Sequence, residues 1–408
     1  VYSSSNGLEK RPKLRFPGSD EPYRTITLGQ IASLVNRTDP TSNAPIMMLS
    51  AGNGFIMQSE KYSRDNAGQS LKKYILLKKG ELAYNHGASK AKQYGCCYEL
   101  TENEARIPYV YHCFKVSGAE HTPYVATALN NPKIDRQLKR LVSSSVRMDG
   151  LLNISFDDYM SVILHLPSLK EQTHIADFLK KFDERITSQE KLVASLKKYK
   201  RGLSKAVFST NSELFPKSTV ASLGELFPFI RNGFVGTVTP FFTSQENGVR
   251  YLQGTNIHDG KISDETAFYV TQAFNQKHSK NILKSNDILV VQSGHVGECA
   301  VVGDNYAGSN CHALIIMSNG GECASDYISQ YINSDDGKKK IAAITTGNTI
   351  KHILATSIAN IEVPLPSKKD QQRIAELLNS WDNRIEQEIR NLCKLVRIKE
   401  GLLQQLFI

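Results

Sequence analysis

The sequence lacks the motifs by which nucleotide-dependent enzymes and methyltransferases are usually identified. Its 408 residues contain no Gly-x-x-x-x-Gly-Lys-Ser/Thr phosphate loop and no Asn-Pro-Pro-Tyr-like motif. Residues 130–133 come nearest to the second motif and are predicted to be a turn at a helix end. No apolar run approaches the length of a membrane span, and no apolar signal region is present near residue 1. We therefore expect a chain without catalytic residues that does not contact a membrane.

Cysteine and histidine do not show the spacing of metal ligands. None of the seven cysteines stands in a Cys-x-x-Cys pair, and the ten histidines do not cluster with Asp or Cys at ligand spacing. We therefore predict no metal site, and we predict seven reduced thiols, as is typical of a cytoplasmic protein.

Charge is in excess on the basic side and unevenly distributed. The formal net charge of +10 indicates a polyanionic partner, most simply nucleic acid. Residues 167–209 contain 10 basic and 5 acidic residues, whereas residues 210–365 contain 11 and 14. If residues 210–365 bind DNA, they must therefore do so through a local patch.

One stretch occurs twice in the chain. Residues 166–208 align without a gap with residues 365–407, which lie 199 positions further on. The identical residues include, in the numbering of the first copy, Leu166, Pro167, Ser168, Gln172, Ile175, Ala176, Leu179, Asp183, Arg185, Ile186, Leu196, Lys200, Gly202, Leu203 and Phe208. Such a match indicates a tandem duplication.

Both copies are predicted to be long helices. Their apolar residues recur in steps of three and four, which places them on one helical face. A Pro-Ser pair marks each start, and neither interior contains proline. About 37 residues at ~1.5 Å each give a rod of roughly 55 Å. A rod with one apolar face needs a partner along its length, so we predict that the copies pair as an antiparallel coiled coil. The alternative is two unrelated surface helices, each on its own domain.

Each long helix follows a segment that is predicted to be globular. Short apolar and β-branched runs at 46–49, 74–77, 82–84 and 109–116 predict strands, and 124–129 and 134–141 predict helices. Residues 210–365 repeat this order, and 327–333 stand where 124–130 stand. The predicted fold is α+β: two mixed α/β globular heads alternating with two long helices. The expected boundaries are 1–166, 167–209, 210–365 and 366–408.

The repeated stretch carries the resemblance to a known family. The pattern Pro-Leu-Pro-Ser-x-x-x-Gln-x-x-Ile-Ala at 364–375, its partner at 166–176, Phe156-Asp157-Asp158-Tyr159, and the strand and Ser-x-Gly loop at 288–297 resemble the specificity subunit of type I restriction–modification enzymes. The resemblance implies two target-recognition domains that read the halves of a split, asymmetric site in double-stranded DNA. The paired helices would set the spacing and dock two methylation subunits and the restriction subunits. It also implies no catalytic centre and no cofactor in this chain, with S-adenosylmethionine, ATP and Mg on the partner subunits.

Polar loops that follow strands are the candidate DNA contacts, because amide, hydroxyl, imidazole and basic groups bind base edges and phosphates. In the first head we single out Asn85, His86, Ser89, Lys90 and Lys92, together with Ser144 and Arg147 of a serine run. In the second head we single out Arg231, Asn232, Gln292, Ser293, His295, Thr346, Asn348 and Lys351.

Less specific interpretations of these features stay open. The loops are alternatively solvated turns, and the serine run is alternatively a linker. The basic helical positions Lys197, Lys198, Lys200, Arg201 and Lys205 contact DNA, partner subunits or only solvent. For the whole chain, the alternatives are a coiled-coil adaptor with two protein-binding heads and an enzyme with an unrecognised active site.

Overall fold

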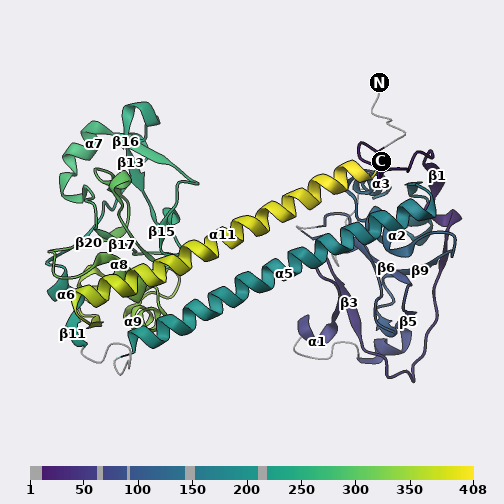
Figure 1. Ribbon diagram of the computed structural model, residues 1–408, viewed down its shortest axis with the longest axis horizontal. Helices are drawn as coiled ribbons and strands as arrows, with labels where there is room; N and C mark the ends of the chain where they lie inside the picture. Colours follow the sequence, from purple (N-terminus) through teal and green to yellow (C-terminus); the bar gives the residue numbers. More distant parts are fainter. Residues whose placement is uncertain (1–11, 62–67, 90–91, 143–151, 210–217) are drawn as a thin grey trace. The chain divides into compact units, whose positions relative to one another are not determined.

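The computed structural model describes residues 12–61, 68–89, 92–142, 152–209 and 218–408 (Figure 1). The chain forms two compact units. The first comprises the described residues up to Ser188 together with Leu392–Ile408, and the second comprises Gln189–Asn391. Each unit therefore combines one head with one part of each long helix. We call residues 12–166 the first head and residues 218–365 the second head.

The first unit is mixed α and β. Its elements are β1 (Arg24–Thr27), β2 (Ala32–Leu34), β3 (Met47–Ser50), β4 (Gly54–Met57), α1 (Gln58–Lys61), β5 (Ile75–Lys78), β6 (Leu82–Asn85), β7 (Cys96–Glu99), β8 (Glu104–Ile107), β9 (His112–Val116), α2 (Thr122–Leu129), α3 (Pro132–Leu141), α4 (Phe156–Met160), β10 (Ile163–Leu166) and parts of α5 (Leu169–Phe208) and α11 (Lys368–Leu406).

The second unit contains the remaining parts of α5 and α11 and a head of similar composition. That head is built from β11 (Thr219–Ser222), α6 (Leu223–Leu226), β12 (Phe229–Asn232), β13 (Gly248–Leu252), β14 (Ile257–His258), β15 (Lys261–Ile262), β16 (Phe268–Thr271), α7 (Gln272–Lys277), β17 (Ile288–Val291), β18 (Cys299–Val301), β19 (Asn310–Cys311), β20 (Leu314–Ser318), α8 (Ser325–Ile332), α9 (Asp335–Ile344), α10 (Ala355–Ala359) and β21 (Glu362–Leu365).

The two heads have the same central sheet. In the first head the strand order is β2-β9-β6-β7, and in the second it is β12-β20-β17-β18. All pairs in both sheets are antiparallel. The helices α2 and α8 follow the corresponding strands, as the sequence predicted. In both heads an Asn after this helix holds a strand residue with its side-chain amide. Asn130 accepts the Cys97 N–H and donates to the Cys97 carbonyl, and Asn333 does the same with Cys299. The predicted internal repeat of the heads is therefore confirmed at the level of topology.

A two-stranded sheet leads from each head into its long helix. The strand β1 pairs antiparallel with β10, and β11 pairs with β21. The chain turns closely beside each of these sheets: a Cβ at Gly29 would lie 3.3 Å from the Met160 carbonyl oxygen, and one at Gly224 would lie 3.2 Å from that of Ala359. Because a Cβ would crowd the backbone at both positions, glycine suits these equivalent places.

The repeated Gln of the Pro-Ser-x-x-x-Gln pattern joins each helix to its head. The Oε1 atom of Gln371 accepts a hydrogen bond from the Ala324 N–H at 2.9 Å, and its Nε2 donates to the Pro366 carbonyl at 2.9 Å. Gln172 makes the same two bonds, with the His121 N–H at 2.9 Å and the Pro167 carbonyl at 3.0 Å. Both side chains are buried. The glutamine of the repeated pattern therefore fixes the start of α2 or α8 to the long helix by hydrogen bonds.

Within each unit α5 and α11 run antiparallel. In the second unit Gln189 donates to the Glu388 carboxylate at 2.7 Å, whereas Lys200, further along α5, pairs with Asp382, which is earlier in α11, at 2.6 Å. In the first unit Lys399 bonds Asp183, which is the same pair of repeat positions with the roles of the copies exchanged. The predicted antiparallel pairing is therefore confirmed within the units.

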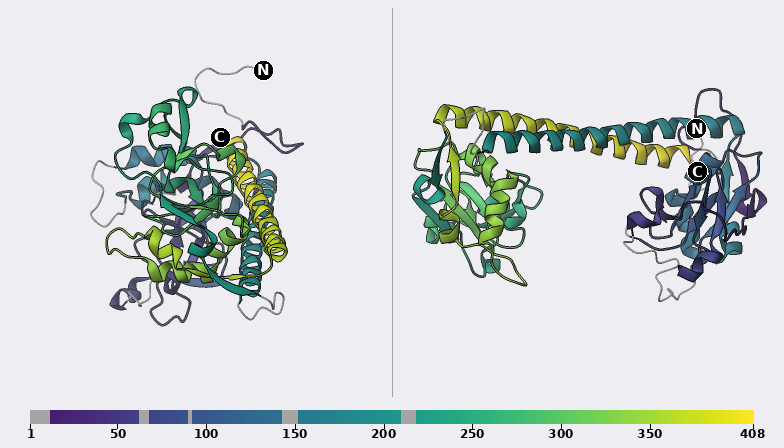
Figure 2. Two further views of the ribbon diagram at one scale, coloured as in Figure 1. Left: turned by 90° about the vertical axis from the view of Figure 1, so that its left-hand side faces the viewer. Right: turned by 90° about the horizontal axis from the view of Figure 1, so that it is seen from below.

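The long helices complete the core of each head. In each unit the strands lie to one side of the helix segments (Figure 2). The core of the first unit includes Tyr124 and Phe114 of the head, Ile175 and Leu179 of α5, and Leu406 of α11. The second unit packs Tyr327 and Tyr331 against the end of α5, through Phe208. The apolar face predicted from the sequence therefore packs both against the other long helix and against the core of each head.

The predicted strands and short helices are found within a few residues of their expected places. The largest difference is the strand expected at 109–116, which begins at His112 because residues 108–111 form a turn closed by the Tyr111 N–H and the Pro108 carbonyl. All seven cysteines are free. Among the described residues, no helix joins the length and the hydropathy that a membrane span requires.

Candidate nucleic-acid interface

Two loops that are far apart in the second-head sequence lie side by side. Backbone hydrogen bonds join Ile353 N–H to the Gln292 carbonyl at 3.1 Å and Gly294 N–H to the Lys351 carbonyl at 3.4 Å. Ser293 and His352 form a β-bridge, and the turn 346–352 is closed by two 2.9 Å bonds between Thr346 and His352. Loop 292–295, after β17, and turn 346–352 therefore form one continuous edge.

The side chains on this edge are available to a ligand. Asn232, Ser293, Thr346, Asn348 and Lys351 are exposed, and Gln292 is half-buried. The Gln292 Nε2 lies 3.4 Å from the Asn232 Oδ1, so β12 contributes to the same surface. We call these six residues the second-head polar surface. The six residues come from three segments that lie far apart in the sequence, the end of β12, the loop after β17 and the turn after α9, and the fold brings these segments together.

Arg231, a predicted DNA contact, lies outside these six residues, and its guanidinium is engaged within the protein. Its guanidinium donates to the Lys280 carbonyl at 2.7 Å and to the Ser318 hydroxyl at 2.6 Å, and it lies 3.8 Å from the Asp287 carboxylate. In the first head Arg37 pairs with Glu81 at 2.6 Å. Glu81 and Asp287 also accept comparable backbone N–H bonds, from Lys78 and Lys284. Arg231 is therefore a structural residue that neutralises a buried carboxylate.

His86, another predicted DNA contact, is enclosed by the protein. The side chain is 6% exposed, and its two ring nitrogens lie 2.7 Å and 2.9 Å from the carbonyl oxygens of Leu152 and Val110. It stacks on His112 with ring centroids 4.9 Å apart. Burial lowers the pKa of His112. Because both nitrogens of His86 are engaged, the ring holds the segment at residue 152 rather than facing a ligand.

Some of the remaining first-head candidates already use their side chains in hydrogen bonds within the protein. The Oδ1 of Asn85 accepts the Gly87 N–H at 2.9 Å, so this amide shapes its own turn. The Lys92 ammonium donates to the Asn130 carbonyl at 2.8 Å. Ser89 is exposed and accepts the Lys92 N–H at 3.1 Å. Lys90, Ser144 and Arg147 lie outside the described residues.

The basic helical positions divide into paired and exposed residues. Lys200 pairs with Asp382 at 2.6 Å, and Arg201 pairs with Asp335 at 2.5 Å. Nearby, Lys261 of the β14–β15 hairpin bonds Glu386, and this hydrogen bond lowers the pKa of that carboxyl. Lys197, Lys198 and Lys205 are exposed. Part of the basic face therefore fixes α5 to α11 and to the second head.

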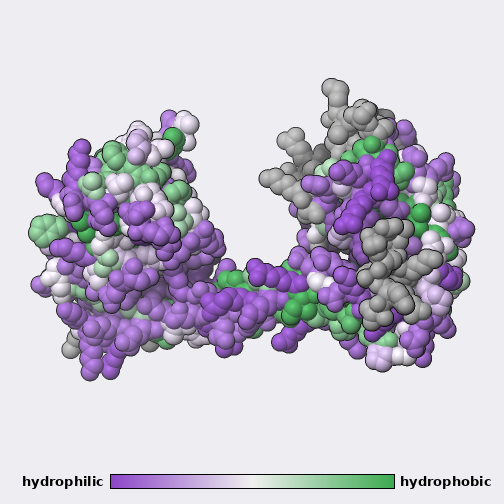
Figure 3. All heavy atoms as spheres, turned by 90° about the horizontal axis from the view of Figure 1, so that it is seen from above, coloured by the Kyte–Doolittle hydropathy of each residue, from purple (hydrophilic) through white to green (hydrophobic). Residues whose placement is uncertain are grey.

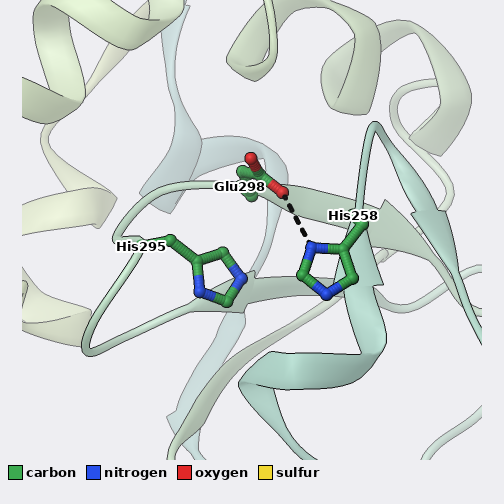
Figure 4. A group of neighbouring side chains, drawn as sticks. All are labelled: His258, His295 and Glu298. Atoms are coloured by element: carbon green, nitrogen blue, oxygen red, sulfur yellow. Dashed lines mark ion pairs between the residues drawn. The ribbon is translucent and has the colours of Figure 1, made fainter. Parts of the chain in front are cut away.

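A group that the sequence did not reveal lies beside the second-head polar surface. His258, His295 and Glu298 converge in Figure 4, and one potential ligand atom from each lies within 4.8 Å of the other two. The sequence prediction considered only Asp and Cys as neighbours of histidine, so it did not consider a group with Glu298. His295 and Glu298 stand three residues apart, which was visible in the sequence. The approach of His258 depends on the β14–β15 hairpin and was not.

Comparison with known proteins gives one consistent result. Residues 214–394 match the family model of the type I restriction modification DNA specificity domain. The chain is 25% identical over 279 residues, 65% of its length, to the type I restriction enzyme MjaVIII specificity subunit of Methanocaldococcus jannaschii. It is 25% identical over 259 residues, 59% of its length, to the putative MjaX specificity subunit of the same organism. These alignments span 66% and 57% of the relatives, so the chain spans less than two thirds of their length.

Solved structures show the same fold. The S subunit of a type I restriction–modification system from M. genitalium superposes with a TM-score of 0.60 at 16% identity, covering 98% of this chain and 99% of that one. A chain from a study of type I restriction–modification complex assembly gives a TM-score of 0.57 at 16% identity, covering 97% and 99%. The resemblance to type I specificity subunits and the predicted α+β fold class are therefore confirmed.

Proposed function

We propose that this chain is the DNA-recognition subunit of a type I restriction–modification enzyme, and that it reads a split, asymmetric site in double-stranded DNA with its two heads. The observation that carries the proposal is the pair of heads that share one sheet order but carry different loops at the ends of equivalent strands. The resemblance to specificity subunits supports the same function. A duplicated scaffold with different loops suits a protein that holds two different half-sites.

The second-head polar surface supplies the chemistry for base contacts. Asn232, Gln292 and Asn348 each carry an amide with a donor and an acceptor, which is the pattern that pairs with adenine in the major groove. Lys351 bears a positive charge for guanine or phosphate, and Ser293 and Thr346 bear hydroxyls that bind phosphate. Five of the six residues stand on two loops joined by backbone bonds, and Asn232 ends strand β12, so their positions are defined before DNA arrives.

The second head is acidic in total, so its contacts must be local. We propose that Lys351 and the exposed helical residues Lys197 and Lys198 supply the positive charge near DNA. His295 lies 3.2 Å from the Ile257 carbonyl through its Nε2, and it borders the polar surface. In the first head, Ser89 is the described candidate that remains exposed, and we retain Lys90, Ser144 and Arg147 as proposed contacts.

We propose that the long helices set the half-site spacing and dock two methylation subunits and the restriction subunits. Figure 3 shows hydrophobic atoms at the surface of the long helices. The large apolar residues of these helices that are more than one third exposed include Leu169, Leu192, Tyr199, Leu377, Val396 and Ile398. Apolar side chains at the surface of a helix are the usual core of a protein interface. On this proposal the chain itself is not catalytic, and S-adenosylmethionine, ATP and Mg are bound by the partner subunits.

A coiled-coil adaptor with protein-binding heads is the competing function. Phe229, Val235 and Ile350 of the second head are each about two thirds exposed, at 68%, 67% and 66%. An adaptor would use them to bind protein. In a DNA reader, apolar side chains near a base edge contact the thymine methyl group.

Methylation mapping separates the two functions. The chain is expressed with its methylation subunit in a host that lacks other methyltransferases, and the genome is sequenced for modified bases. We expect one split motif whose half-site for the second head changes or relaxes in Gln292→Ala and Asn348→Ala. The control is Glu246→Gln, an exposed position in the second head outside the polar surface. An unchanged motif in both alanine variants would reject the assigned surface, and the absence of any chain-dependent methylation would favour the adaptor.

A further inference from the structure

Three side chains of the second head present metal-binding atoms to one point. His258 is at the end of β14, His295 lies in the loop after β17, and Glu298 precedes β18 (Figure 4). The His258 Nδ1 lies 3.9 Å from the Glu298 Oε2, and all three potential ligand atoms lie within 4.8 Å of one another. Ligands at about 2.0–2.1 Å from a tetrahedral zinc ion are roughly 3.3 Å apart. The three atoms therefore need to close by about 1.5 Å or less to reach that geometry.

Hydrogen bonding prepares His258 to act as a ligand. Its Nε2 lies 2.8 Å from the Thr255 carbonyl oxygen, which can only accept a hydrogen bond. In the neutral ring the proton is therefore on Nε2, and the lone pair is on Nδ1, the atom that faces Glu298. A backbone carbonyl that orients the distal N–H is the usual support of a metal-bound histidine.

Glu298 supplies an unsatisfied acceptor at the same point. Its Oε2 is buried and has no hydrogen-bond partner, although the side chain as a whole is 33% exposed. A buried carboxylate oxygen without a donor is costly, so a cation that binds it is favoured. The nearest positive group is His258 itself when protonated, at 3.9 Å, which is too long for a hydrogen bond.

The backbone under the three residues is fixed, while two of the side chains are exposed. The Gly297 N–H bonds the Val291 carbonyl at 2.9 Å, and a Cβ at Gly297 would lie 2.3 Å from Ile341, so the turn before Glu298 is tightly packed. His258 is paired with Lys261 across the β14–β15 hairpin. The rings of His258 and His295 are stacked 5.2 Å apart. Because the His295 ring is exposed, it is able to turn toward the His258 Nδ1 and the Glu298 carboxylate, which need only small shifts to bind one ion.

We propose that His258, His295 and Glu298 form a binding site for a zinc-class divalent cation, which ties the loop 292–298 to the β14–β15 hairpin. Two imidazoles and one carboxylate suit Zn²⁺, Co²⁺ or Ni²⁺ better than Mg²⁺ or Ca²⁺, which prefer oxygen ligands. Three protein ligands leave a fourth position for water. This site does not depend on DNA recognition, so it stands or falls separately from the proposed function.

Direct binding measurements test the proposal. The full chain, without a histidine tag and after chelator treatment, is titrated with ZnCl₂ by calorimetry and with CoCl₂ by visible absorption. We expect one equivalent to bind, and we expect His258→Asn, His295→Asn and Glu298→Gln each to weaken zinc binding at least about tenfold. The matched controls are His165→Asn in the first head and Glu265→Gln beside the hairpin, which should bind as the wild type does. Circular dichroism confirms that each variant is folded.

Hydrogen exchange reports on the role of the ion. Zinc should slow amide exchange in 292–298 and 257–262 of the wild type and leave both segments of Glu298→Gln unchanged. The proposal is overturned if the wild type binds less than about half an equivalent at 100 µM zinc, since such weak binding corresponds to a free energy below about 5–6 kcal/mol. It is equally overturned if all three site variants bind as tightly as the controls, because the ion would then lie elsewhere.

Discussion

Replacing Gln371 by methionine should destabilise the second unit, although it changes the side-chain volume little. Gln371 is 2% exposed, and both ends of its amide are used. Its Oε1 accepts the N–H of Ala324, the residue that precedes α8, and its Nε2 donates to the Pro366 carbonyl. Methionine fills the same space but is at best a weak acceptor and donates no hydrogen bond.

The size of the effect follows from the groups that lose their partners. A buried backbone N–H without an acceptor costs about 1–3 kcal/mol, and the carbonyl of Pro366 adds up to about 1 kcal/mol. We therefore expect a loss of about 1–4 kcal/mol in the free energy of unfolding. For a unit of this size each kcal/mol lowers the melting temperature by about 2–4 °C, so the transition should fall by roughly 2–16 °C.

Thermal and urea unfolding followed by far-ultraviolet circular dichroism measure the change. The matched control is Gln372→Met, the same substitution at the exposed neighbouring position, which should stay within about 0.5 kcal/mol of the wild type. Gln172→Met should destabilise the first unit by a similar or larger amount, because Gln172 also donates to Glu120 at 2.6 Å. If Gln371→Met and Gln372→Met unfold at the same temperature and the same urea concentration, the repeated glutamine does not stabilise the fold, and our explanation of the motif is wrong.

Three further predictions concern thiols, ion pairs and helix length. Burial raises the pKa of the thiols of Cys96 and Cys323 to about 11 and of Cys113, Cys299 and Cys311 to about 12, and Cys97 is also buried. At pH 8 only the exposed Cys393 should therefore react rapidly with a thiol reagent. The variant Cys393→Ser should abolish this fast reaction, and a second rapidly reacting thiol would contradict the described burial. Lys200→Met should cost about 1–3 kcal/mol because it removes the ammonium from the half-buried Asp382, whereas Lys198→Met, at an exposed position, should cost less than about 0.5 kcal/mol by urea unfolding. Deleting seven residues around Gln189 and the equivalent seven around Glu388 should shorten the paired helices by about 10 Å. The preferred gap between the half-sites should then shorten by about 3 base pairs. A methylation map in which the half-sites themselves changed would argue against the helices as spacers.

The long helices and the repeat were predictable because their signals are local or internal to the sequence. Steps of three and four between apolar residues such as Ile175 and Leu179 define one face whatever the rest of the chain does. The ungapped match between the copies then identified the partner helix. The repeated order of elements in the heads suggested that α2 and α8 are equivalent, and in both cases the residue before the helix donates its N–H to a glutamine of the repeat.

The candidate site was less predictable because the role of a polar residue depends on distant partners. Arg231 became a structural residue through Asp287, 56 positions away, and His86 through the carbonyls of Val110 and Leu152. The reverse occurred at His258, which meets His295 and Glu298 only because a hairpin turns at Asp259 and Gly260, both with positive φ. In contrast, Gln292 and Thr346 belong to loops that follow equivalent elements in both heads, so order along the chain placed these loops, and the structure shows that they are joined.

The way the second-head loops are joined has an evolutionary consequence. Loop 292–295 and turn 346–352 are tied to each other by main-chain hydrogen bonds, at Gly294 and Lys351, at Gln292 and Ile353, and within the turn at Thr346 and His352. Main-chain atoms are present in every residue, so the bonds survive when the exposed side chains at 293, 348 or 351 change. On the proposed function, a few point substitutions at these positions would change the DNA target while the main-chain bonds keep the two loops folded. Variation in what is read is separated from the structure that holds it, which favours rapid diversification.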